Sequence, residues 1–277
     1  MNRLARLSVL AAATLSVIVP ITGCKSLQAR DQLNKGVRAY KSQRYEEAIE
    51  HFQQAVNLDP SLPMTNTYLA TAYAQQVVAG ADTPENLRSA ELAINGYQKV
   101  LTEKPKDINS LKGIAAMYMN TNRYDEAKLW QKKVIDADPT DADAAYTVGV
   151  IDWTLARKNA VKDLAAAGLQ DMSDGNPKAP KPVCQKIVED NTPLVDEGLQ
   201  YLNKAVDIRN NYDAAMAYIN LLYRRKADLE CGNDPARKSD LAQADSWLAK
   251  AMGTRKANDE KKAQTGGIVL DTNGNSQ

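Results

Sequence analysis

Two residue types that build many catalytic and metal sites are scarce in this 277-residue chain. It contains one histidine, His51, and three cysteines, Cys24, Cys184 and Cys231. A multi-histidine metal site is therefore excluded, and only His51 remains as the base of a Ser-His-Asp type site. The sequence also lacks a Gly-rich phosphate loop, a Cys-x-x-Cys pair and a Gly-x-Ser-x-Gly motif. We therefore expect a protein that is not an enzyme and that uses no cofactor and no metal.

An excess of either charge sign is also missing. The chain has 35 basic and 34 acidic residues. Binding to nucleic acid usually requires a concentrated basic patch, so no nucleic-acid partner is expected. One short basic cluster, Arg224-Arg225-Lys226, follows a predicted helix. Such a cluster is most often a solvated helix end, which is our expectation, while an acidic partner or lipid headgroups remain the alternative.

The chain has no apolar run long enough to span a bilayer comfortably, which takes about 20 residues. Its most apolar stretch, residues 9–21, is short, interrupted by polar residues and a proline, and preceded by Arg3 and Arg6. A basic segment followed by a short apolar segment is typical of a secretory signal peptide. We therefore expect residues 1–23 to be removed, which leaves a net charge of −1 on the mature chain.

The end of this segment, Ile21-Thr22-Gly23-Cys24, resembles the cleavage box of bacterial lipoproteins. The resemblance implies cleavage before Cys24 and attachment of lipid, palmitate included, to its sulfur and amine. Several acyl chains give a lasting membrane anchor. The residue after Cys24 is Lys25 and not Asp, which favours the outer membrane, facing the periplasm. The alternative is an ordinary signal peptide with an incidental cysteine. Residues 24–28 would be the lipidated cysteine and a short linker.

The next stretch, 29–62, has small, aromatic and proline residues at fixed spacings. It resembles a tetratricopeptide repeat (TPR), a helix–turn–helix unit of about 34 residues. The residues that match are Gly36, Tyr45, Ala48, Phe52, Ala55 and Pro60. Two signature positions differ, because Gln32 and Ala39 stand where the family has Trp and Tyr.

A single hairpin of this kind cannot bury its apolar faces, so neighbouring copies are required. Further stretches with the same pattern follow at 64–105, 107–139, 140–205 and 212–252. We expect insertions at 77–87, where Thr83-Pro84 should cap a helix, and at 155–193, where the second helix should resume near Pro193. The predicted fold is an all-α, right-handed TPR-type solenoid of about five helical hairpins over residues 29–252. Residues 253–277 are polar and predicted to be a disordered tail.

Cys184 and Cys231 fall in the predicted loops of repeats four and five. Equivalent loops of adjacent repeats lie on the same edge of a solenoid, so a disulfide between them is expected, and a secreted chain permits it. The alternative is two unpaired thiols.

The resemblance implies that the first helix of each repeat lines a concave, partner-binding groove. Two positions that bind chaperone C-termini in some TPR domains hold Leu33 and Val37, so that carboxylate clamp is missing. For each aromatic residue in the groove, packing between repeats is the alternative role. The groove residues implied by the register are Asn34, Val37, Tyr40, Lys41, Thr67, Thr71, Gln75, Lys112, Met119, Asn120, Tyr146 and Trp153.

Two functions follow from these observations. The first is a lipid-anchored scaffold of the bacterial cell envelope that binds envelope proteins or peptides in its concave groove. The second is a small-ligand-binding or enzymatic accessory protein that uses the loops inserted in repeats two and four.

Overall fold

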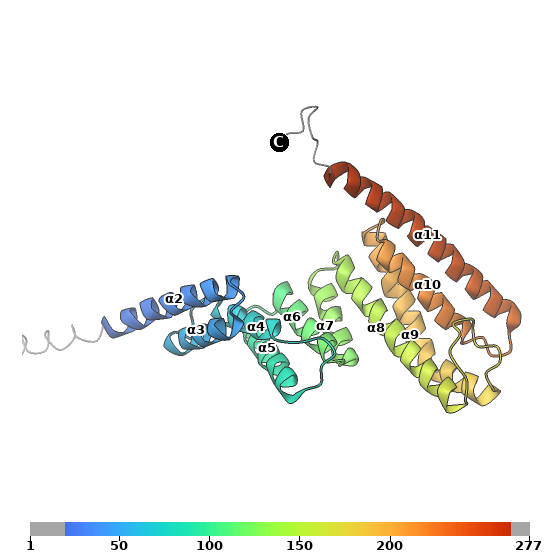
Figure 1. Cartoon of the computed structure of the whole chain (residues 1–277), viewed down its shortest axis with the longest axis horizontal. Helices are drawn as coiled ribbons and strands as arrows, with labels where there is room; N and C mark the ends of the chain where they lie inside the picture. Colours follow the sequence, from blue (N-terminus) through green and yellow to red (C-terminus); the bar gives the residue numbers. More distant parts are fainter. Residues whose placement is uncertain (1–19, 267–277) are drawn as a thin grey trace, which may run out of the picture. The chain divides into compact units, whose positions relative to one another are not determined.

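The computed structural model describes residues 20–266, and every regular element in this range is an α-helix. The fold class is therefore all-α, as predicted, and ten helices follow one another along the described residues (Figure 1). None of the helices in this part of the chain is long and apolar enough to cross a membrane. The helices are α2 (Pro20–Lys41), α3 (Tyr45–Leu58), α4 (Thr65–Gln75), α5 (Pro84–Glu103), α6 (Ile108–Asn120), α7 (Tyr124–Ala137), α8 (Ala142–Ala166), α9 (Lys181–Ile208), α10 (Asp213–Ala227) and α11 (Asp234–Gly266).

The chain divides into two compact units, unit 1 ending at Trp130 and unit 2 beginning at Gln131. In unit 1, α2 packs on α3 and α4 packs on α5. The small residue Gly36 makes the first contact possible, since a Cβ there would lie 2.5 Å from the Phe52 ring. Ala48, Phe52 and Ala55 are fully buried in α3. Gly36, Ala48, Phe52 and Ala55 therefore form the helix–helix contact that the pattern predicts.

The expected insertion in repeat two is a loop, residues 76–83, that is closed by one buried side chain. The Asn86 side chain donates to the carbonyl oxygens of Val78 (3.0 Å) and Ala81 (2.8 Å) and accepts from Val78 N (2.7 Å). Thr83 caps α5 by accepting from Asn86 N at 3.2 Å, with Pro84 as the first helical residue. The predicted cap is therefore confirmed. The backbone polar groups of Val78 and Ala81 in the loop are hydrogen-bonded to the Asn86 side chain.

The insertion in repeat four differs from the prediction. We expected the second helix to resume near Pro193, but α9 begins at Lys181 and continues through Pro193. The reason is tertiary packing, because Ile187 and Asn191 are buried against α8 and Asn191 Nδ2 donates to Ala156 O at 2.9 Å. Most of the insertion therefore lengthens the α8–α9 hairpin, and only residues 167–180 are irregular.

Both ends of the predicted solenoid also differ from expectation. Residues 24–28, predicted as a linker, lie within α2, and the predicted signal peptide falls largely outside the described residues. The predicted disordered tail begins as helix, because α11 continues to Gly266. Arg255 in this extension pairs with Asp213 (2.9 Å), and Asn258 donates to Asn211 O (3.0 Å). Residues 267–277 lie outside the described residues.

The close approach of α8 and α9 can be tested at Gly149. A Cβ there would collide with the Leu202 side chain and lie 3.0 Å from the Gly198 carbonyl oxygen. We expect Gly149→Ala to lower the free energy of unfolding by about 1–3 kcal/mol through overpacking. Chemical denaturation measures the change.

The matched control is Gly253→Ala, a helical position with nothing within 4 Å of the added Cβ. This change should be neutral or stabilise by roughly 0.5–1 kcal/mol, because alanine favours helix. Equal losses from the two substitutions would contradict the packing argument.

Candidate functional site

Unit 2 has an aromatic cluster, formed by Tyr146, Trp153, Tyr212 and Tyr218. Tyr146 and Trp153 are two helical turns apart and therefore share one face of α8. Tyr218 of α10 packs edge-on against both, with ring centroids 5.5 Å from Tyr146 and 5.3 Å from Trp153. All four side chains are half-buried. The cluster thus offers aromatic surface to solvent along the contact between α8 and α10.

One end of the aromatic cluster is polar. The Tyr212 hydroxyl donates to Asp143 Oδ1 at 2.7 Å, and Arg209 donates to both carboxylate oxygens of Asp143 at 3.0 Å. Burial raises the pKa of Tyr146 to about 12. The pKa of Tyr212 is also raised, mainly by burial and next by the hydrogen bond to Asp143. Both hydroxyls therefore stay protonated at neutral pH and act as hydrogen-bond donors.

The predicted groove residues of unit 1 have more varied surroundings. Val37 and Tyr40 pack against the core formed by α2, α3 and α4, and Tyr40 contacts the Tyr45 ring at 5.4 Å. Thr71 Oγ1 lies 3.3 Å from the Tyr97 hydroxyl. For these residues packing between helices is the evident role.

The remaining predicted positions of unit 1 are more open. Half-buried positions are Thr67, Lys112, Met119 and Asn120, and exposed ones are Asn34, Lys41 and Gln75. The Asn120 carbonyl accepts from Gly80 N at 2.7 Å, which ties the 76–83 loop to the end of α6. This face of unit 1 is therefore mainly polar.

Sequence reasoning missed Tyr212 and Tyr218. The register that selected Tyr146 and Trp153 was applied only as far as repeat four, although the sequence also predicts a repeat at 212–252. Applying the same register one repeat further selects Tyr218. Tyr212 precedes the helix, and only its contact with the Tyr146 ring at 5.0 Å shows that it belongs to the cluster.

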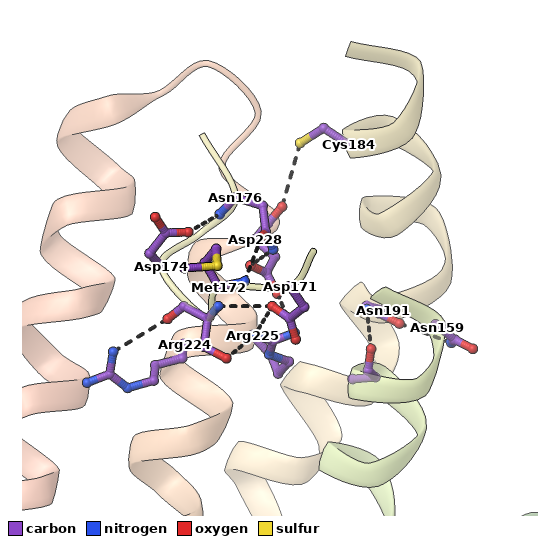
Figure 2. A network of polar contacts seen from close by, with 12 residues as sticks. Asn159, Asp171, Met172, Asp174, Asn176, Cys184, Asn191, Arg224, Arg225 and Asp228 are labelled. Atoms are coloured by element: carbon purple, nitrogen blue, oxygen red, sulfur yellow. Dashed lines mark hydrogen bonds and ion pairs between the residues drawn. The ribbon is translucent and has the colours of Figure 1, made fainter. Parts of the chain in front are cut away.

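The basic cluster at 224–226 is not a solvated helix end, so that expectation is wrong. Arg225 is only 2% exposed and donates two hydrogen bonds to the Asp171 carboxylate, at 2.9 and 3.0 Å (Figure 2). Asp228 Oδ2 lies 3.0 Å from Arg225 Nη1. We call these three residues the buried ion-pair cluster. The acids come from the 167–180 loop and the end of α10, and the distant Asp171 gave no local sequence signal.

The flanking cations are paired as well. Arg224 contacts Asp245 at 2.7 Å, and Lys226 contacts Asp240 at 2.9 Å, both acids on α11. The whole basic triplet therefore serves contacts within unit 2. Neither an acidic partner nor a lipid headgroup is needed to explain it.

The two carboxylates of the buried ion-pair cluster differ in proton affinity. Burial raises the pKa of Asp228 to about 7, against the opposing effect of Arg225. Its Oδ2 makes no hydrogen bond, which leaves the charge poorly compensated. Burial also acts to raise the pKa of Asp171, but the hydrogen bond and charge of Arg225 bring it below its ordinary value. The positive charge of Arg225 thus offsets the cost of burying the Asp171 carboxylate but not that of burying Asp228.

The predicted disulfide between Cys184 and Cys231 is confirmed. The two Cα atoms are 5.8 Å apart, inside the range that a disulfide requires. The bond spans 47 residues, which corresponds to about 4 kcal/mol on the chain-entropy model. Cys184 lies in the first turn of α9 rather than in a loop, because α9 begins at Lys181, while Cys231 lies in the turn between α10 and α11.

The described part of the chain is an all-helical repeat structure, a class whose stacked hairpins form extended binding surfaces. Within this class the chain carries tetratricopeptide repeats. A family model described as TPR repeat matches residues 36–77, and one described as tetratricopeptide repeat matches residues 113–141. The resemblance to tetratricopeptide repeats is therefore confirmed over these residues.

Solved structures of MamA have a similar fold. One, described as the crystal structure of MamA protein, has a TM-score of 0.55 and 15% identity, covering 86% of this chain and 94% of that chain. Another, MamA 41-end from Desulfovibrio magneticus RS-1, has a TM-score of 0.53 and 17% identity, covering 84% and 97%. At this identity the likeness concerns the fold alone. A search of curated protein sequences gives no match.

Because the two acids of the ion-pair cluster differ in proton affinity, replacing each by asparagine should change stability by different amounts. Asp171 is ionised near neutral pH, so Asp171→Asn should cost about 3 kcal/mol of unfolding free energy at both about pH 5.5 and about pH 8. Asp228→Asn removes the excess charge and should cost less at about pH 8. Urea denaturation of the full chain at both pH values measures the effects.

The sign of the pH dependence follows from the raised pKa of Asp228. Between the ordinary value near 3.8 and about 7, the folded protein holds a proton that the unfolded chain has released. Stability from this group is therefore present at low pH and is lost as pH rises through about 7. Asp228→Asn should flatten this decline. An unchanged decline, or a loss at about pH 8 equal to that of Asp171→Asn, would contradict the assignment.

Proposed function

We propose that this protein is a non-enzymatic, lipid-anchored scaffold of the bacterial cell envelope that binds partner proteins on the first helices of its repeats. The fold supports the general part of the proposal, since tetratricopeptide repeats present extended surfaces to other proteins. The observation that carries it is the aromatic cluster of unit 2. Half-buried Tyr and Trp side chains are the residues most enriched at binding hot spots.

The surroundings of the aromatic cluster indicate what kind of segment it receives. Asp143 is already compensated by Arg209 and Tyr212, so the polar end carries little net charge. The exposed aromatic surface favours an extended peptide or a partner helix with apolar side chains. The Tyr212 hydroxyl donates its proton to Asp143 and would accept a hydrogen bond from the bound segment at this edge.

The membrane anchor is supported by the sequence around Cys24. A basic segment, a short apolar segment and Gly23-Cys24 follow one another as in lipoprotein signals. Cys24 is exposed and forms no disulfide. Lys25 favours the outer membrane, with the repeats in the periplasm. An oxidising compartment also agrees with the Cys184–Cys231 disulfide.

The alternative, a small-ligand-binding or enzymatic accessory protein, has weaker support. The hollow at the repeat-four insertion has a volume of about 270 Å³ and is lined by residues such as Leu164, Met172 and Pro177. Ligand sites usually occupy roughly 300–1,000 Å³ with convergent polar groups. In the repeat-two loop, the carbonyl oxygens of Val78 and Ala81 already accept hydrogen bonds from the Asn86 side chain. Neither insertion therefore favours this function over protein binding.

Partner binding at the aromatic cluster can be tested by crosslinking the intact lipoprotein in envelope preparations and identifying the captured proteins. We expect Trp153→Ala to reduce capture of the partner about tenfold or more, since truncating a hot-spot residue costs about 2 kcal/mol or more. Trp247→Ala is the matched control, because Trp247 lies on α11, is not one of the four cluster residues and has Lys250 over its ring at 4.5 Å. Equal capture by both variants, or no envelope protein captured, would count against the proposal.

The anchor has a separate test. Cys24→Ser removes the sulfur that would carry lipid, so we expect loss of acyl-chain labelling and a shift from the membrane to the soluble fraction. Metabolic labelling with a palmitate analogue and fractionation of cells measure both. Lys25→Asp is the control for sorting and should leave labelling intact. Unchanged membrane attachment of Cys24→Ser would refute the lipid anchor.

A further inference from the structure

The 167–180 loop turns through several residues with left-handed backbone angles. Gly168, Ser173, Gly175 and Asn176 all have positive φ angles, at 71°, 55°, 82° and 43°. Glycine adopts positive φ readily and asparagine does so more often than most residues, so only Ser173 is held in a sparsely populated region. The loop is also held by contacts from outside it.

Those contacts come from α10 and α11. Arg225 donates to Asp171 and to Ser173 Oγ (3.1 Å), and Asn176 Nδ2 donates to Asp228 Oδ1 at 2.8 Å (Figure 2). Arg237 of α11 donates to Asp174 O at 2.7 Å. The loop is thus docked mainly through polar groups on the end of α10 and the start of α11.

The loop also lies flush against these helices. A Cβ at Gly175 would come within 2.6 Å of the Arg237 side chain and 2.9 Å of Ala227 O. The loop backbone therefore follows the surface formed by the end of α10 and the start of α11. Docking therefore depends on where the turn between these two helices is held.

The Cys184–Cys231 disulfide holds that turn. It joins the first turn of α9 to the α10–α11 turn, three residues after Asp228. Cys184 Sγ lies 3.6 Å from the Asp228 carbonyl oxygen, so the covalent bond keeps Asp228 beside the loop (Figure 2). Cys231 is exposed, whereas Cys184 is buried. The disulfide can therefore be attacked from solvent at Cys231 while it covers a buried group of charges.

We propose that the Cys184–Cys231 disulfide is a redox switch for the 167–180 loop. Reduction by a dithiol frees the α10–α11 turn from α9, opens the buried ion-pair cluster to water and releases the loop from α10. Oxidation restores the docked loop. The switch is local, because the helices of unit 2 keep apolar contacts, such as those of Leu202 and Leu222, that involve neither cysteine.

The chemistry balances as thiol–disulfide exchange. A thiolate of the dithiol attacks Cys231 Sγ, forming a mixed disulfide, and Cys184 leaves as a thiolate that takes up a proton. The second thiol of the reductant, as its thiolate, attacks the mixed disulfide and frees Cys231, which is protonated in turn. The reductant ends as a disulfide, and two electrons and two protons have passed to the protein. A disulfide oxidant reverses the steps.

Hydrogen exchange followed by mass spectrometry tests the switch on the full chain with Cys24→Ser, which removes the free thiol. With dithiothreitol, we expect amide exchange in 167–180 and 228–233 to accelerate about tenfold or more, while α3 and the middle of α8 keep their protection. The double variant Cys184→Ser/Cys231→Ser should show the fast exchange with and without reductant.

Two results would overturn the proposal. One is unchanged protection of 167–180 in protein whose Cys184 and Cys231 are shown to be reduced by thiol labelling. The other is loss of protection over α8–α11 together, which would mean that the disulfide supports the whole unit and not the loop. Cleavage by trypsin after Lys178, which is exposed, gives an independent readout and should accelerate only in the reduced protein and in the double variant.

Discussion

The close approach of paired helices is the constraint on which this structure depends. At Gly36, Gly149 and Gly198 an added Cβ would collide with a side chain of a neighbouring helix. Each collision partner, Phe52, Leu202 and Leu222, is fully buried. The small residues therefore fix the distance between helices, and the large ones fill the space that remains. A hairpin built this way still has an apolar face, which the next hairpin must cover.

Unit 2 adds a second kind of interaction to this scheme. Toward the far end of α8, where the hairpin outgrows the repeat template, polar groups join the apolar contacts of Ala160, Leu164 and Ile187. Asn191 binds the Ala156 carbonyl inside the α8–α9 contact, and Arg225 is buried between two acids. Buried ion pairs add little net stability but strongly penalise other arrangements. Hydrogen-bonded and charged side chains therefore fix the arrangement of α8, α9 and α10 at this end of unit 2. The Cys184–Cys231 disulfide joins two of its segments covalently.

The repeat pattern was readable from sequence because it rests on local spacing. The helical hairpin of 29–62 and the cap at Thr83 follow from residue types at fixed distances, and the disulfide follows from the order of the repeats. The path of α9 through Pro193 was not readable, because the loss of one backbone hydrogen bond is offset by burial against α8. The helix beyond Met252 likewise depends on Arg255 and Asn258 meeting α10.

The aromatic cluster and the buried ion-pair cluster could be predicted only in part, because both depend on tertiary contacts. Tyr146 and Trp153 follow from the register, but their grouping with Tyr218 requires α8 and α10 to pack side by side. The ion pair between Asp171 and Arg225 joins residues that are 54 positions apart. Contacts of this kind are set by tertiary packing, and composition or periodicity does not reveal them.

The aromatic cluster and the 167–180 loop lie at opposite ends of α8. Trp153 is 13 residues before the last residue of α8, Ala166, which corresponds to about 20 Å along the helix. Between them α8 is packed against α9 through buried residues such as Ala156, Ala160 and Leu164. A rigid, well-packed helix transmits a change only if it has a second stable arrangement. The structure shows no such alternative for α8. Release of the loop should therefore leave the aromatic cluster in place, and the redox state would govern a separate surface of the same scaffold.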